Sequence, residues 1–192
     1  MSSRGKLFIL SAPAGTGKTT LVNRLVKELP HVVQSISYTT REPREMEVNG
    51  IHYHFVTPET FQKRIASGDF LEHVTLYGDD YGTSRSTVEK LLNSGKHVFL
   101  VIDTQGALML KGKVPAVFIF VSPPSIDILR ERVERRKTEK REKIEARLKL
   151  AEQEMQKRKE YDFEIVNDNL DEAFQKLKRI VLSEEKDGKS NE

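Results

Sequence analysis

Nine consecutive residues near the N-terminus have the types and order of a phosphate-binding loop. Residues 11–19 read Ser-Ala-Pro-Ala-Gly-Thr-Gly-Lys-Thr and match the pattern G-x-x-x-x-G-K-[ST], except that Ala12 replaces the first glycine. The glycines let backbone N–H groups converge on phosphate oxygens, the lysine reaches the β- and γ-phosphates, and the last hydroxyl ligates Mg²⁺. The segment predicts a site for a magnesium-bound nucleoside triphosphate, formed by Ala14, Gly15, Thr16, Gly17, Lys18, Thr19 and Thr20. For this segment alone, a glycine-rich turn with a surface lysine is the alternative.

A second group of residues suited to phosphate binding lies between positions 37 and 55. Arg41 and Arg44 are followed by Tyr53. Arginines bind phosphate oxygens in a bidentate manner, and a tyrosine hydroxyl can donate to them. Since triphosphate loops occur in GTPases, motor ATPases and small-molecule kinases alike, the acceptor must be inferred from residues outside the loop.

A third candidate region is the basic stretch 130–149, which holds ten basic and five acidic side chains. Arg132 and Arg136 are four residues apart, so a helix would present both on one face, and Arg147 comes from the next helical stretch. Together they could close over triphosphate oxygens. A solvated, salt-bridged pair of helices or a weak nucleic-acid patch is the alternative.

Asp103 follows the apolar run Val98–Ile102. We therefore expect it at the carboxyl end of a sheet strand, where ligands of open α/β sheets bind. A polar residue that merely ends the strand is the alternative.

Four short apolar runs predict the strands that position these residues, and they lie at Leu7–Leu10, Val98–Ile102, Ala116–Val121 and Phe163–Val166. Helices are expected between them. One opens at Thr57-Pro58 and closes at Gly68, one is capped by Ser86 with Glu89, one by Ser125, and the last by Asn169. This alternation predicts an α/β domain with a mainly parallel sheet covered by helices on both faces.

We expect one domain over residues 1–192, since the chain is too short for two. Its core would comprise residues 4–36, 86–129 and 150–183. Residues 37–85 interrupt the alternation and predict a small mixed β/α insertion, 130–149 a helical lid, and 184–192 a frayed polar tail.

Bulk composition excludes several classes of protein. The chain has no cysteine, which excludes disulfides, thiolate metal sites and a cysteine nucleophile. The net charge of +3 is too small to indicate a nucleic-acid partner. The run Leu7–Leu10 is too short for a signal peptide or a membrane span, so a cytoplasmic protein is expected. The five histidines are scattered and predict no metal site.

Taken in order, these motifs resemble the guanylate kinase family. The family segment S-x-S-x-T-T-R-x-P-R-x-G-E-x-x-G-x-x-Y-x-F is matched from Ser35 to Phe55, with Met46 in place of its first glycine. The resemblance covers nearly the whole chain. It continues through Phe70-Leu-Glu72, Tyr81-Gly-Thr83, Ile102-Asp-x-Gln-Gly106, Pro123-Pro-Ser125, Arg132-x-x-x-Arg136, Arg147 and Ile165-Val-Asn-Asp168.

The resemblance implies transfer of the γ-phosphoryl group of MgATP to GMP, and to dGMP, without a general base. It implies that the GMP phosphate is held by Arg41, Arg44, Tyr53 and Tyr81, and the guanine base by Ser37, Glu72 and Thr83. Asp103 would lie near Mg²⁺ and the acceptor, with Thr19 as the second ligand of the metal, and Asn167 would lie beside the adenine. Lys18, Arg132, Arg136 and Arg147 would stabilise the transferring charge. In many family members an acid precedes Asp103 by two residues, where this chain has Val101.

Three rival functions follow from the same residues. A scaffold domain of this fold that has lost catalysis is disfavoured because Lys18 and Thr19 are intact. A kinase for AMP, UMP or dTMP is disfavoured because a carboxylate at Glu72 suits the N1–H and amino group of guanine. A basic nucleic-acid binder is the third. The oligomeric state is not predicted.

Overall fold

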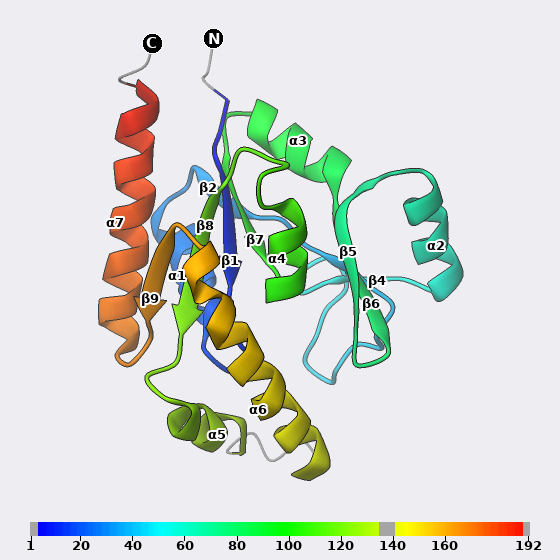
Figure 1. The fold of residues 1–192 in the computed structure, drawn as a ribbon. Helices are drawn as coiled ribbons and strands as arrows, with labels where there is room; N and C mark the ends of the chain where they lie inside the picture. The colour runs from blue at the N-terminus through cyan, green and yellow to red at the C-terminus, as the bar shows by residue number, and fades with distance from the viewer. Residues whose placement is uncertain (1–3, 135–140, 190–192) are drawn as a thin grey trace.

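The computed structural model describes residues 4–134 and 141–189. Strands and helices alternate along most of the chain, as the sequence predicts (Figure 1). The strands are β1 (Leu7–Ser11), β2 (Val32–Gln34), β3 (Tyr38–Thr39), β4 (His54–Phe55), β5 (Phe70–Leu76), β6 (Asp79–Ser84), β7 (His97–Val101), β8 (Val117–Ser122) and β9 (Phe163–Val166). The helices are α1 (Lys18–Glu28), α2 (Pro58–Ala66), α3 (Arg85–Asn93), α4 (Thr104–Leu110), α5 (Ile126–Glu134), α6 (Arg141–Gln156), the 3₁₀ turn η1 (Lys157–Glu160) and α7 (Leu170–Lys189).

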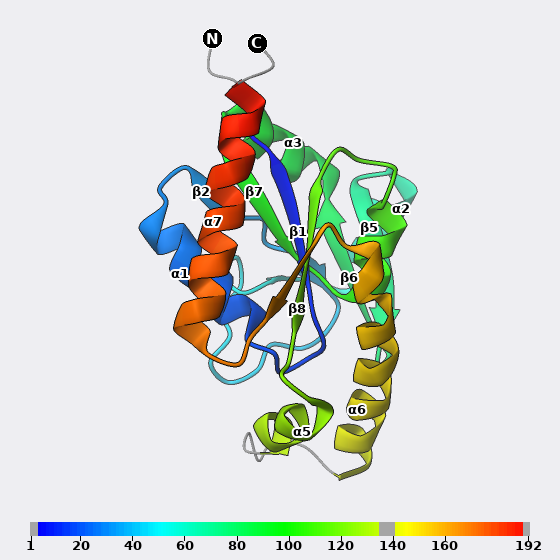
Figure 2. The ribbon, with the colours of Figure 1, turned by 60° about the vertical axis from the view of Figure 1, so that its left-hand side comes forward.

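Five strands form a parallel central sheet in the order β2-β7-β1-β8-β9. Apolar side chains of β1 alternate between its faces: Phe8 and Leu10 pack toward α1 and α7, whereas Leu7 and Ile9 pack toward α3 and α4. Figure 2 shows α1 and α7 together on one side of this sheet. The predicted α/β class is therefore confirmed, with a core on each face of the sheet.

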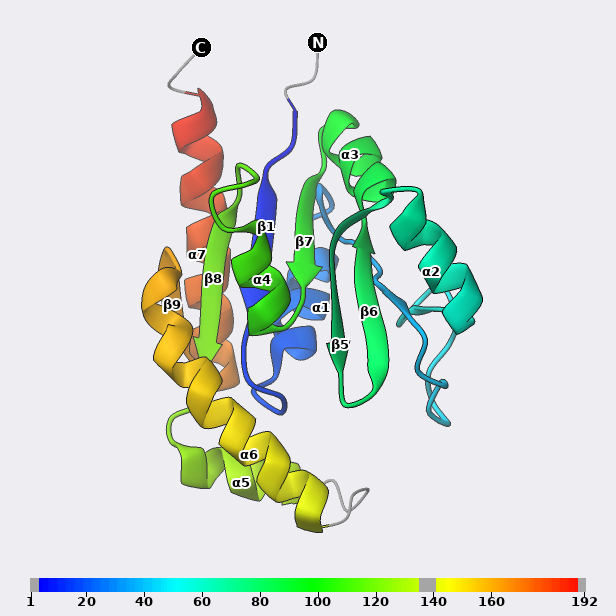
Figure 3. The same cartoon turned by 45° about the vertical axis from the view of Figure 1, so that its right-hand side comes forward.

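A second, mixed sheet carries the predicted insertion. Its strand order is β4-β3-β6-β5, with β3 and β4 parallel and β5 and β6 antiparallel. Strands β5 and β6 form a hairpin beside α4, and α2 covers them with Phe61 against Phe70. In Figure 3 the hairpin tip points toward the end of the molecule where α5 and α6 lie.

Helices α5 and α6 share a small apolar cluster of their own, made of Leu129, Val133, Leu148 and Ala151. An exposed ion pair between Arg130 and Glu145 also joins them. Further along α6, Met155 packs against the core beneath α3 and α4. Helix α6 therefore connects the lid region to the central sheet.

Three of the predicted helix starts agree with the structure and one does not. At the start of α2, Thr57 Oγ1 accepts from Thr60 N at 3.3 Å, and Pro58 follows as the first helical residue. The side chain of Ser125 accepts from Ile128 N at 3.1 Å, and Asn169 Oδ1 accepts from Asp171 N at 2.9 Å. The predicted cap Ser86, however, lies inside α3. Ser84 caps this helix instead, because it is the residue with extended backbone and its Oγ accepts from Thr87 N.

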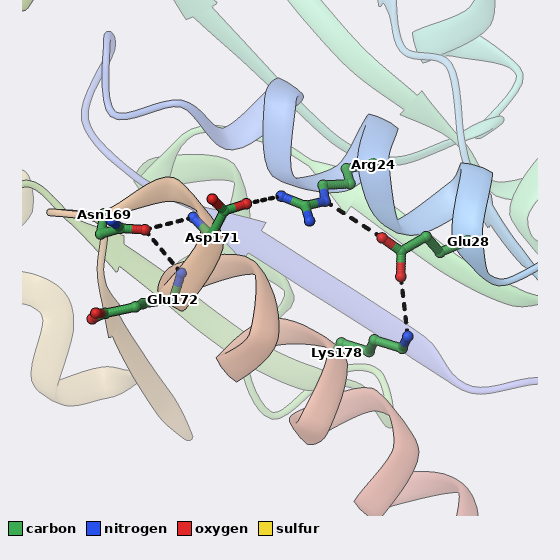
Figure 4. Close-up of polar contacts among 6 residues, drawn as sticks. All are labelled: Arg24, Glu28, Asn169, Asp171, Glu172 and Lys178. Atoms are coloured by element: carbon green, nitrogen blue, oxygen red, sulfur yellow. Dashed lines mark hydrogen bonds and ion pairs between the residues drawn. The ribbon is translucent and has the colours of Figure 1, made fainter.

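Helix α7 continues to Lys189, where the sequence predicted a frayed tail from residue 184. The continuation has partners: Glu184 bonds Lys6, and Glu185 Oε1 lies 2.6 Å from His31 Nε2. At its other end, α7 is joined to α1 by ion pairs of Arg24 with Asp171 and of Lys178 with Glu28 (Figure 4). None of the helices in the described ranges combines the length and the apolar character that a membrane span requires.

Candidate active site

The phosphate loop lies between β1 and α1, as predicted. Gly15 and Gly17 have φ values of 96° and 89°, a left-handed backbone that glycine adopts without strain. Ala12 is buried and is not among the residues with positive φ, so its methyl group causes no backbone strain there. The ammonium group of Lys18 donates to the carbonyl of Ala12, which folds the lysine over its own loop.

Asn167 braces the loop from the end of β9. Its Nδ2 donates to Thr16 O at 2.6 Å, and its side chain is buried. A Cβ at Gly17 would lie 2.8 Å from the same amide nitrogen, so glycine is needed there for space as well as for its φ. Arg132 of α5 donates to Asn167 O at 3.0 Å. The candidate adenine contact is thus also a structural link between loop and lid.

One cavity of about 790 Å³ joins the loop to the insertion. Of the residues predicted from sequence, its walls include the whole loop segment 14–20, together with Ser37, Arg44, Tyr53, Glu72, Tyr81, Asp103 and Arg147. The residues Arg41, Thr83, Arg132 and Asn167 are not among those that line this cavity. Arg136 lies outside the described residues, so its predicted role has no structural counterpart here.

Glu72 is a buried acid in the cavity wall, and Thr83 is its hydrogen-bond partner. Glu72 is 4% exposed, and its Oε1 accepts from Thr83 Oγ1 at 2.6 Å, across paired positions of β5 and β6. Burial raises the pKa of Glu72 from 4.5 to about 7, and the nearby charge of Asp103 adds to this, against the hydrogen bond from Thr83. Gly106 of α4 packs so closely that a Cβ there would lie 2.6 Å from Glu72 Oε2. The carboxylate therefore has one defined position.

Arg41 is held by a partner from its own loop. Its guanidinium Nη2 donates to both oxygens of Glu47, at 2.8 and 2.9 Å, and Glu47 Oε2 also accepts from Arg44 N. The guanidinium carbon also lies 5.5 Å from the centre of the Tyr53 ring. Burial raises the pKa of Tyr53, so its hydroxyl keeps its proton and is available as a donor.

Asp103 lies directly after β7 and caps α4, as its predicted place at a strand end requires. Its Oδ1 accepts from Gln105 N at 2.8 Å and from Gly106 N at 3.1 Å. This cap uses one carboxylate oxygen and fixes the side chain at the cavity wall. Val101, the departure from the family pattern, also lines the cavity and offers no acid there.

Glu154 and Tyr77 are among the cavity residues that the sequence did not indicate. Glu154 of α6 accepts from Thr104 Oγ1 at 3.0 Å, and burial raises its pKa while the charge of Lys18 lowers it. Tyr77 forms the tip of the β5–β6 hairpin. No sequence pattern indicates Glu154. For Tyr77, the following glycine suggests a two-residue turn, and such a turn often requires the positive φ that Tyr77 adopts.

Two of the histidines that were expected to be scattered, His31 and His97, meet at the amino ends of β2 and β7. His31, His97 and Glu185 place three possible ligand atoms within 4.8 Å of one another. His97 Nδ1, however, accepts from Lys6 N at 2.9 Å. A neutral His97 must then carry its proton on Nε2, facing Glu185, so the group forms a hydrogen-bonded cluster rather than a ready metal site.

A triphosphate loop and a separate acceptor pocket that open into one cavity place the chain among the P-loop nucleoside monophosphate kinases. The family model for guanylate kinase matches residues 4–184. A guanylate kinase of Protochlamydia amoebophila is 56% identical over 181 residues, covering 94% of this chain and 92% of that protein. One from Clostridium perfringens is 45% identical over 184 residues, covering 95% and 85%.

The comparison with solved structures agrees. The crystal structure of guanylate kinase from Anaplasma phagocytophilum has a TM-score of 0.79 at 32% identity, covering 95% of this chain and 87% of that one. The chain belongs to the guanylate kinase family. It is accordingly an ATP:GMP phosphotransferase.

Proposed function

We propose that the protein transfers the γ-phosphoryl group of ATP to GMP and to dGMP, with each site residue in the role described below. The observation that carries the proposal is the buried carboxylate of Glu72, which accepts a hydrogen bond from Thr83 and lines the same cavity as the phosphate loop. An acidic side chain is expensive to bury unless it serves a ligand or a partner. Guanine provides additional hydrogen-bond donors for the carboxylate of Glu72.

Guanine presents two adjacent donors, N1–H and the exocyclic amino group, to a carboxylate at Glu72. Adenine has no proton on N1 and would leave one carboxylate oxygen unpaired, a strong ground for discrimination. Ser37 lines the same cavity, and its hydroxyl suits the guanine carbonyl. Thr83 orients Glu72 from behind. None of these contacts involves the ribose 2′-hydroxyl, so dGMP is accepted as well.

The acceptor phosphate is bound by cationic and hydroxyl donors. Arg44, Tyr53 and Tyr81 line the cavity, and Arg41 stands behind Tyr53 with Glu47 as its partner. The guanidinium groups neutralise the phosphate, whose own oxygen attacks the donor. Because that oxygen is already anionic near neutral pH, no general base is needed.

The donor phosphates bind to the loop amides and to Lys18, with Asn167 fixing the loop and lying on the adenine side. The oxygen donors of this part of the cavity, the Thr19 hydroxyl and the Asp103 carboxylate, fit Mg²⁺, which prefers oxygen ligands. Bound there, Mg²⁺ supplies positive charge to the phosphate oxygens. Arg132, Arg136 and Arg147 complete the charge stabilisation from the lid.

One assay tests the proposal: formation of ADP from MgATP with GMP, dGMP, AMP, UMP and dTMP offered in turn. Turnover is expected with GMP and dGMP, and little with the other three. Absence of turnover with GMP would refute the proposal. Salt-dependent binding of RNA without turnover would favour the nucleic-acid alternative instead.

A further inference from the structure

Tyr77 is the only residue other than glycine with a positive φ in the described ranges, at 56°. It precedes Gly78, with a φ of 91°, in the two-residue connection between β5 and β6. Positive φ at both positions is the pattern of a type I′ turn, in which asparagine or aspartate followed by glycine is favoured. A tyrosine in this place is unfavourable for the backbone.

The tyrosine side chain makes no compensating contribution to the core. It is 54% exposed, one of the largest exposed apolar surfaces in the described chain. Strained positions that persist in a fold are concentrated at functional sites. We therefore expect the contacts of the Tyr77 ring, rather than its burial, to account for a tyrosine at this position.

The ring faces a lid residue across the cavity. The guanidinium carbon of Arg147 lies 5.7 Å from the centre of the Tyr77 ring, within the range of a cation–π contact. Both residues line the cavity that also holds the phosphate loop and the acceptor residues. Arg147 comes from α6, and Figure 3 shows the hairpin tip pointing toward the end of the molecule that contains this helix.

The hairpin that carries Tyr77 also carries three of the residues proposed to bind the acceptor GMP. Glu72 belongs to β5, whereas Tyr81 and Thr83 belong to β6. Tyr81 is only four residues from Tyr77. If a bound acceptor reduces the motion of this hairpin, it therefore also reduces the motion of the Tyr77 ring, which contacts Arg147.

We propose that Tyr77 is a positioning residue for Arg147: its ring holds the guanidinium group between the donor and acceptor parts of the cavity. This inference rests on the proposed function, because Arg147 acts there on the transferring phosphate. An arginine side chain has several rotatable bonds, and holding its planar group in advance reduces the entropy lost when the phosphates arrive. The binding of GMP and the binding of ATP then reinforce each other through the Tyr77–Arg147 contact.

Two substitutions distinguish the effect of the Tyr77 ring from the effect of this residue on the turn backbone. Tyr77→Asn removes the ring and installs a residue that the turn favours, so the fold should be at least as stable as in the wild type. Tyr77→Phe keeps the ring and serves as the matched control. For each protein, the affinity for a non-hydrolysable ATP analogue with Mg²⁺ is measured by calorimetry without GMP and with saturating GMP, and the melting temperature is recorded.

In the wild type, GMP is expected to tighten the binding of the analogue. In Tyr77→Asn this tightening falls by about three- to fivefold, the size of an exposed cation–π contact, while the affinity for GMP alone stays unchanged. Tyr77→Phe retains the wild-type behaviour. A merely structural role of Tyr77 would instead lower the melting temperature of Tyr77→Asn or change its affinity for GMP alone.

The inference is overturned if Tyr77→Asn keeps the full wild-type coupling, or if Tyr77→Phe loses as much coupling as Tyr77→Asn. A wild-type protein that fails to phosphorylate GMP would refute the proposed function itself. The two failures are distinguishable, because turnover of GMP by the wild type with unchanged coupling in Tyr77→Asn contradicts only the role of Tyr77.

Discussion

The pocket around Glu72, which we propose binds guanine, and helices α5 and α6, which we propose belong to a lid, are built in opposite ways. In the pocket, Glu72 is almost fully buried, bonded by Thr83 and enclosed by Gly106. In the lid, α5 and α6 share one small apolar cluster and an exposed ion pair between Arg130 and Glu145. Exposed ion pairs contribute little to stability and are easily broken.

This difference follows from what each region must do. Discrimination between bases requires polar groups that are fixed before the ligand arrives, since a mobile carboxylate could adapt to the wrong base. Covering ATP requires a segment that can move, which needs weak attachments. The phosphate loop belongs with the first kind of region, because the buried side chain of Asn167 holds it through a hydrogen bond to Thr16 O.

The largest expected effect comes from Lys18→Ala, which tests whether the ATP part of the cavity acts independently of the GMP part. Lys18→Ala removes the ammonium group beside the triphosphate, so turnover should fall by about a thousandfold or more. The affinity for GMP, measured by calorimetry, should stay close to the wild-type value. Lys27→Ala, an exposed lysine at the other end of α1, is the matched control and should leave turnover unchanged. A comparable loss of GMP affinity in Lys18→Ala would show that the donor and acceptor parts of the cavity do not bind their substrates independently.

Glu72→Gln tests the acceptor half. The amide NH₂ would oppose the donors of guanine, so kcat/KM for GMP should fall by about a hundredfold, while the affinity for the ATP analogue is retained. An equal loss for every acceptor would contradict the assigned role of Glu72.

The same variant has a predicted pH signature in stability. The folded-state pKa of Glu72 is raised from 4.5 to about 7, so the folded protein holds this proton more tightly than the unfolded chain. The contribution of Glu72 to the free energy of unfolding is therefore greatest below pH 4.5, and up to about 3 kcal/mol of it is lost as the pH rises to about 7. Glu72→Gln has no such loss. Denaturant unfolding at pH 5 and pH 8 measures this difference: the free energy of unfolding of Glu72→Gln, relative to that of the wild type, should be higher at pH 8 than at pH 5.

Gly106→Ala tests whether the position of Glu72 matters as much as its charge. The new Cβ would lie 2.6 Å from Glu72 Oε2 and must displace the carboxylate, so KM for GMP should rise by about tenfold or more. The backbone of α4 accepts alanine readily. Glu72→Asp in the same protein shortens the acid and relieves the contact, so the double variant should lose less than the two single losses combined. Strict additivity would mean that the two residues do not interact.

Much of the central fold was predictable, because its signals are local. Strand β9 occupies Phe163–Val166 as expected, and Ser125 and Asn169 cap their helices as expected. The short strand β2 was missed because three residues, Val32–Gln34, give no periodic pattern. The end of α7 was placed too early because its stabilising partners, Lys6 and His31, come from distant parts of the chain.

The site was predictable in its types of residue and less so in its contacts. The ordered motifs identified many of the polar residues that line the cavity, since each of these carries a chemical type suited to phosphate or guanine. Glu154 and Tyr77 look ordinary in the sequence. Only the fold brings Glu154 to Thr104, and Tyr77 to Arg147.

The smallest of these effects concerns Asn167, which links the fixed loop to the movable lid. Its Nδ2 donates to Thr16 O, and its carbonyl accepts from Arg132. Asn167→Ala removes only the side-chain bond and leaves the buried carbonyl of Thr16 without that donor. KM for ATP should rise by about fivefold, in line with the cost of one such hydrogen bond, while KM for GMP stays unchanged. Asp168→Ala, an exposed neighbour, is the control. If Asn167→Ala also weakened GMP binding, the loop would be coupled to the guanine pocket, and the contrast between the two ends of the cavity would no longer hold.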